Sequence, residues 1–193
     1  MTPTRRIDFR RLEPGLTERF DILCLDTEFT RLPLPKEGID DWAWMARVLS
    51  VGIAAVSGHA PGTFYVKRRV DRGIRKVSSP FVLEQVLPVM SCAPADLEAA
   101  TDAEIDEALR GFQEQRRYRT GLPAMFAIDW PGDAYLIETV TGETCDWLLL
   151  DDLPEIQRAL DGLMSEGRVR HNALHDALMV RDQLRSMTGL LSV

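Results

Sequence analysis

Two carboxylates with a spacing of two residues stand at the end of a predicted buried strand. Asp26 is the last residue of the apolar run 20–26, and Glu28 lies two residues later. Side chains two residues apart project from the same face of a strand. Together they could share a hard cation such as Mg²⁺, which prefers oxygen ligands. By itself an Asp-x-Glu pair is more often a solvated edge, because charged side chains are mostly exposed. The apolar run instead favours a central strand, and the ends of such strands bind ligands in open α/β sheets.

A second acidic pair lies about a hundred residues further on. Asp133 follows Pro131-Gly132 and opens a predicted helix, where an aspartate is also simply a good helix cap. Asp129 stands four residues earlier, at the end of a predicted strand. It is the competing carboxylate for any role in this segment.

The third chemically suggestive segment combines a histidine with a carboxylate. Asp176 falls in the first turn of an amphipathic helix predicted over 173–187, where a negative charge is favourable to the helix dipole. His171 lies five residues upstream, in or just before the cap region. A metal-assisted hydrolase needs such a pair, because the histidine takes a proton from the attacking water while the carboxylate holds the metal.

The elements that must position these residues alternate between strands and helices. Short apolar runs rich in strand formers predict five strands, and capping signals with helical periodicity predict five helices. Thr101 and Glu104 form a capping-box signature at the start of one helix. Residues 1–19 are expected to be an irregular lead-in and residues 30–46 an inserted loop or lid. The predicted strands are 20–26, 48–56, 63–67, 124–129 and 147–150, and the predicted helices are 78–90, 101–118, 133–140, 154–164 and 173–187.

This order predicts an α/β protein with a mixed five-stranded sheet flanked by helices. Three strands form a meander, and strand-helix-strand units with right-handed crossovers follow. This arrangement of strands and helices is that of the ribonuclease H-like fold. The length of 193 residues favours a single domain over 1–193.

Composition narrows the class of protein further. The net charge of −7 argues against broad binding of duplex nucleic acid, which needs many Lys and Arg residues, and favours a short footprint at a metal centre. The three scattered cysteines form neither a disulfide framework nor a zinc spacing, so we expect a reducing, cytoplasmic environment. No apolar run is long enough for a membrane span, and no apolar segment of a secretory signal follows the N-terminal arginines.

The three motifs, taken in order, resemble those of the DEDDh exonucleases. Asp26-Thr27-Glu28-Phe29-Thr30 resembles the first motif, and His171, Ala173, Asp176 and Ala177 match the third. Asp129 and Asp133 fall on the two positions of the second motif. The aspartate at 129 departs from the asparagine that is frequent there. The segment 79–88 and the Asp-Trp-Pro-Gly-Asp stretch 129–133 further resemble the small bacterial exoribonucleases of the RNase AS type, known for adenylate-containing RNA.

The resemblance implies a metal-dependent 3′-5′ exoribonuclease that releases nucleoside 5′-monophosphates from single-stranded RNA. Two Mg²⁺ ions, which Mn²⁺ could replace, would clamp the scissile phosphate, and His171 would deprotonate the attacking water. The implied metal ligands are Asp26, Glu28, Asp133 and Asp176. The residues expected against the substrate are Thr27, Phe29, Leu32 and Asp129, with Phe29 and Leu32 stacking on or wedging beside terminal bases.

Several alternatives stay open at this level. A DNA-directed exonuclease of the proofreading or repair type, or a silent nucleic-acid-binding module on the same fold, would share much of the pattern. The basic stretch 67–76 is either a solvated turn or a track for the nucleic-acid backbone. Trp42 and Trp44 are lid aromatics or a contact in a homodimer.

Overall fold

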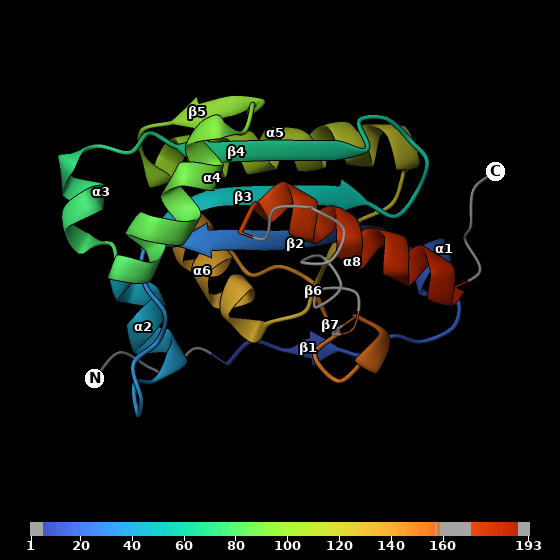
Figure 1. Cartoon of the computed structure of the whole chain (residues 1–193). Coiled ribbons are helices and arrows are strands. Elements are labelled where there is room, and N and C mark those ends of the chain that lie inside the picture. Colours follow the sequence, from blue (N-terminus) through green and yellow to red (C-terminus); the bar gives the residue numbers. More distant parts are fainter. Residues whose placement is uncertain (1–5, 157, 159–170, 189–193) are drawn as a thin grey trace.

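The computed structural model describes residues 6–156, 158 and 171–188. The fold of these residues is built around one mixed sheet (Figure 1). The sheet has seven strands in the order β1-β7-β6-β2-β3-β4-β5. The strand β3 runs antiparallel to both of its neighbours, β2 and β4. The strands β1, β7 and β6 join the sheet parallel to β2, and β5 pairs parallel to β4. Their bounds are β1 Phe9–Arg10, β2 Asp21–Phe29, β3 Val48–Ala55, β4 Thr63–Arg68, β5 Leu97–Ala99, β6 Ala124–Ile128 and β7 Trp147–Leu149.

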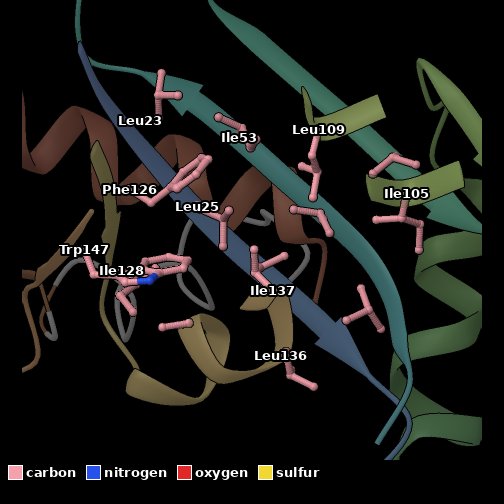
Figure 2. Packing of buried hydrophobic residues seen from close by; sticks show 14 of the residues in the cluster. Leu23, Leu25, Ile53, Ile105, Leu109, Phe126, Ile128, Leu136, Ile137 and Trp147 are labelled. Atoms are coloured by element: carbon pink, nitrogen blue, oxygen red, sulfur yellow. The ribbon is translucent and has the colours of Figure 1, made fainter. Parts of the chain in front are cut away.

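Helices cover both faces of this sheet. On one face α5 (Asp102–Thr120) and α6 (Pro131–Thr141) pack against the central strands, and on the other face α8 (Ala173–Thr188) crosses β2 and β3. Figure 2 shows Leu25 of β2, Leu109 of α5 and Ile137 of α6 meeting in the larger core cluster. Each face has its own core, because alternate residues of β2 point to opposite sides.

The capping box predicted from the sequence is present at the start of α5. Thr101 accepts from the backbone N–H of Glu104, and the Glu104 carboxylate accepts from the Thr101 backbone N–H, so the capping box starts α5. Gly121 ends α5 with a φ of 70°, a left-handed conformation that glycine adopts without strain. These local signals explain why the helix boundaries lie close to those predicted.

The fold class is the predicted one, but the sheet has two more strands than the five expected. Residues 1–19 are not wholly irregular, because β1 pairs with β7 and a short helix α1 (Leu16–Arg19) buries Leu16. The strand β5 was also missed. All three elements are short, and such pieces carry too few residues to show a period.

The segment 30–46 is not simply a loop or lid. It contains the helix α2 (Ile39–Met45), and the side chain of Trp42 is fully buried, with its Nε1 donating to the backbone oxygen of Arg31 at 2.7 Å. Trp42 therefore belongs to the core and cannot be an exposed lid aromatic or dimer contact, while Trp44 is 65% exposed. The buried tryptophan was not recognised because its partners come from distant parts of the chain.

The region predicted as one helix over 78–90 follows a less regular path. The helix α3 (Arg72–Val77) precedes it, and a π-helical turn η1 (Val82–Val86) leads into α4 (Leu87–Cys92). Only 154–156 and 158 of the helix predicted over 154–164 fall within the described residues. In the described part of the chain, no helix combines the length and apolar character required to cross a membrane.

Candidate active site

The strand β2 carries Asp26 and Glu28 within the sheet, since it continues to Phe29 rather than ending at Asp26. On one face of β2, Cys24 packs in the cluster that includes Val180 of α8. Asp26 and Glu28 share that face by the alternation of a strand, so both carboxylates project towards α8. Thr27 points to the opposite face, towards α6.

Helix α6 brings Asp133 to the same end of the sheet. Asp133 lies in the first turn after Pro131, is 2% exposed, and accepts a hydrogen bond from the Thr27 hydroxyl at 2.5 Å. That hydrogen bond links α6 to β2. Asp129 follows directly on the end of β6 and is half-buried.

Helix α8 delivers Asp176 from the other face. The buried side chain of Asn172 caps this helix by accepting from the backbone N–H groups of Leu174 and His175, at 3.1 and 3.2 Å. The helix can approach the sheet because β3 has a glycine there. A Cβ atom on Gly52 would lie 2.2 Å from the backbone nitrogen of Leu174, far inside contact distance. Gly52 faces Asp26 across the β2–β3 pair, so the close approach sets Asp176 beside Asp26.

The carboxylates converge as two overlapping groups. Oxygen atoms of Asp26, Glu28 and Asp176 all lie within 4.8 Å of one another, and so do oxygen atoms of Asp26, Asp129 and Asp133. Asp26 belongs to both groups. Two cations placed in these groups would therefore share one carboxylate, and hard oxygen donors of this kind suit Mg²⁺ or Mn²⁺.

The electrostatics of the site favour a bound cation. Burial raises the pKa of Asp26 well above its usual value, and the neighbouring charges of Asp133, Asp176, Glu28 and Asp129 raise it further. Burial and the charge of Asp129 likewise raise the pKa of Asp133, against the opposing hydrogen bond from Thr27. Negative charges held this close repel one another, and a divalent cation would relieve that repulsion.

His171 lies at the edge of the acidic cluster, on the segment that leads into α8. Its backbone has a φ of 71°, a strained value for a residue with a side chain. Its Nδ1 lies 3.9 Å from Oε1 of Glu28, and its ring meets the ring of Phe81 edge-on with centroids 5.1 Å apart. The imidazole is therefore held beside the carboxylates rather than turned to solvent.

A cleft of about 240 Å³ opens over the acidic cluster. Leu32, 56% exposed, and Phe81, 44% exposed, form apolar parts of its wall. Phe29 also lines the cleft, but its ring packs against Trp42 and Trp130, with centroids 5.1 and 5.4 Å away. The lining residues are Asp26, Thr27, Glu28, Phe29, Leu32, Phe81, Val82, Val86, Asp129, Trp130, Asp133, His171 and Asp176.

The structure gathers all nine site residues named from the sequence around this one cleft. Within the cleft, the Thr27 hydroxyl donates a hydrogen bond to the Asp133 carboxylate and so helps to hold that carboxylate in place. Sequence reasoning did not single out Phe81, Asn172 or Gly52. A signal existed for Gly52, because an isolated glycine inside an apolar strand often marks a close backbone approach.

Comparisons with known proteins agree with the geometry at the level of the fold. No protein-family model matches the sequence, and no curated protein matches it. Among solved structures, that of S. pombe Pop2p in its Mg²⁺- and Mn²⁺-bound form is 18% identical, with a TM-score of 0.52, covering 92% of this chain and 88% of that one.

Two yeast structures give the same result. The RNase domain of yeast Pop2 is 12% identical with a TM-score of 0.54, covering 91% of this chain and 80% of that one. A match in the yeast NOT1 MIF4G domain co-crystallised with CAF1 is 11% identical with a TM-score of 0.57, covering 91% and 82%. The chain thus has the predicted α/β fold class, which it shares with these solved structures, one of them an RNase domain.

Proposed function

We propose that this protein is a metal-dependent 3′-5′ exoribonuclease that releases nucleoside 5′-monophosphates from single-stranded RNA. The observation that carries the proposal is the pair of carboxylate groups that share Asp26. A pair of cation positions with a common ligand, at the end of a central strand, suits phosphodiester hydrolysis with two metal ions. The ribonuclease fold and the histidine beside the cluster support the same class of reaction.

The metal ligands in this proposal are four of the five acidic residues of the cleft. Asp26, Glu28 and Asp176 would hold one Mg²⁺ ion, and Asp26 with Asp133 would hold the second; Mn²⁺ could replace Mg²⁺. The S. pombe Pop2p structure, which has the same fold, is a form with both of these ions bound. When bound, the two ions supply charge that polarises the attacking water and stabilises the scissile phosphate in the transition state.

His171 is the general base. A histidine is suited to this role because its ordinary pKa lies close to neutrality. Its ring lies against Phe81 on one side and close to Glu28 on the other, so the imidazole can accept a proton from a water molecule in the cleft. The carboxylate of Glu28 stabilises the imidazolium that forms.

The substrate is the 3′ end of a single strand. The cleft of about 240 Å³ has room for the end of a chain but not for a continuous duplex. The exposed Leu32 and Phe81 on its wall suit contact with bases, because base–aromatic stacking does not depend on sequence. RNA is preferred over DNA on the strength of the ribonuclease neighbours, and a preference for adenylate-rich RNA follows the resemblance to the RNase AS type.

A cytoplasmic location fits this function. Cys24 and Cys92 are free thiols. Cys24 is buried, and burial raises the pKa of its thiol to about 12, so it is inert. Free cysteines are the usual state in a reducing compartment.

The test is a time course on 5′-labelled RNA and on DNA of the same sequence, each with Mg²⁺ or Mn²⁺. We expect a ladder on RNA that shortens one nucleotide at a time, slower shortening of DNA, almost none of blunt duplex, and no reaction with a chelator. Faster degradation of DNA would assign the enzyme to the DNA-directed class. Cleavage of a circular strand would show an endonuclease, and tight RNA binding without cleavage would show a binding module.

A further inference from the structure

The basic segment 67–76 divides into two parts with different partners. Lys67 pairs with Glu98 at 3.2 Å and donates to the backbone oxygen of Ala93, and Arg68 is buried and pairs with Asp102. These two cations hold β4 and its neighbours together and are not available to a ligand.

The other part is an exposed set of cations on and beside α3. It consists of Arg69, Arg72, Arg75 and Lys76, which we call the α3 basic surface. Among the described residues, none of the ion pairs involves any of the four. Asp71, the one acid among them, caps α3 by accepting from the backbone N–H of Ile74 at 2.8 Å. Its carboxylate offsets only one of the four positive charges, so the surface keeps a net positive charge.

This surface lies next to the cleft because α3 packs on the element that forms the cleft wall. Ile74 on α3 contacts the small core cluster that contains Val82 and Val86, and these two valines also line the cleft. The chain runs directly from α3 to Phe81, and the five residue-to-residue steps from Lys76 to Phe81 span at most about 18 Å. Figure 1 shows α3 at the end of the molecule to which the arrow of β2 points.

The charge distribution indicates what this surface binds. The chain has a net charge of −7, and the cleft itself is lined with carboxylates. A polyanionic strand gains little from the rest of such a molecule, so an exposed basic surface beside the cleft has a large effect on where the strand runs. A row of Lys and Arg side chains suits the phosphates of single-stranded nucleic acid.

We infer that the α3 basic surface binds the phosphates of the RNA strand upstream of the 3′-terminal nucleotide held in the cleft. This inference rests on the proposed function and adds the path of the substrate to it. The surface contributes affinity for long substrates and takes no part in the hydrolysis itself. Its contribution therefore depends on substrate length and on salt.

The test compares two double variants that change the net charge equally. Arg72→Glu/Arg75→Glu alters the α3 basic surface, and Arg117→Glu/Arg119→Glu alters exposed arginines in the last turn of α5, away from the cleft lining. Each is assayed with Mn²⁺ on a long single-stranded RNA, on a dinucleotide, and on a p-nitrophenyl ester of a nucleoside 5′-monophosphate. Circular dichroism melting establishes that both variants are folded.

For the α3 variant we expect kcat/KM on long RNA to fall on the order of ten-fold at moderate salt. The magnitude of its salt slope should fall by about 1.4, since each phosphate contact on a single strand contributes about 0.7. Cleavage of the dinucleotide and of the ester should not change, and the α5 variant should behave as the wild type. Equal loss on all substrates, or no loss on long RNA, overturns the inference. A wild type that cleaves none of the three substrates overturns the proposed function instead.

Discussion

Gly52 and Asp26 stand opposite each other on β3 and β2, and the missing side chain of Gly52 is what lets α8 rest beside Asp26. The absence of a side chain at position 52 therefore affects where a carboxylate of the candidate site lies. The first turn of α8 carries Asp176, and its distance from Asp26 is set by how closely the helix approaches β3.

We expect Gly52→Ala to lower both stability and metal affinity. Its Cβ would meet the backbone at Ala173 and Leu174 at about 2.2 Å, so the helix must shift, and overpacking of this kind costs about 1–3 kcal/mol. Thermal unfolding and Mn²⁺ titration by calorimetry measure the two effects. Gly58→Ala is the matched control, because a Cβ there has no atom within 4 Å. Unchanged Mn²⁺ affinity in Gly52→Ala would contradict the role assigned to the close approach.

The carboxylates should destabilise the metal-free protein at neutral pH. The folded-state pKa of Asp26 lies above its unfolded value, through burial and neighbouring charges. The folded state therefore binds this proton more tightly, so the associated stability is present in acid and is lost as pH rises from the ordinary carboxyl range through the folded-state pKa. We expect Asp26→Asn, without metal, to become more stable than the wild type over this rise. Thermal unfolding across pH measures it.

Addition of Mg²⁺ should reverse the order of stability of the wild type and Asp26→Asn. Asp26 belongs to both cation groups, so Mg²⁺ should stabilise the wild type and leave Asp26→Asn nearly unchanged. Asp41→Asn, an exposed change on α2, serves as the control and should follow the wild type throughout. A variant stabilised by Mg²⁺ as strongly as the wild type would remove Asp26 from the proposed ligands.

Loss of the general base should separate turnover from metal binding. We expect His171→Ala to cut kcat by about 10²–10⁴-fold while Mn²⁺ affinity stays close to that of the wild type. His175 is exposed in the first turn of α8, and His175→Ala is the matched control with little expected effect. Single-turnover kinetics with a parallel Mn²⁺ titration tests both. Full activity in His171→Ala, or equal losses in the two variants, would rule out the assignment.

The two tryptophans of α2 should differ sharply in their effect on stability. Trp42 is fully buried between Phe29 and Trp130, so Trp42→Ala should cost about 3–5 kcal/mol. Trp44 is 65% exposed, and Trp44→Ala should change the free energy of unfolding by less than about 0.5 kcal/mol. Urea denaturation measures both. Similar losses would contradict the placement of α2 in the core.

Local sequence signals were sufficient for five of the strands, for the helices α5, α6 and α8, and for nine of the residues that line the cleft. The apolar run before Asp26, the capping box of Thr101 and Glu104, and the helix that carries Asp176 are all written in neighbouring residues. Spacing along a strand puts Asp26 and Glu28 on one face whatever the rest of the chain does, because the side-chain period of a strand is two. The order of the predicted strands and helices along the chain indicated the fold class, because a meander followed by right-handed crossovers gives a mixed sheet with helices on its faces.

Contacts between distant segments were decided only by the tertiary structure. The packing of Trp42 against Phe29 and Trp130, the hydrogen bond from Thr27 to Asp133 and the ring of Phe81 against His171 join residues 13 to 106 positions apart. The division of the basic segment into paired Lys67 and Arg68 and an exposed α3 surface also depends on Glu98 and Asp102 arriving from elsewhere. Such contacts leave no period in the sequence, because each is set by the packing of whole elements rather than by the residues beside it.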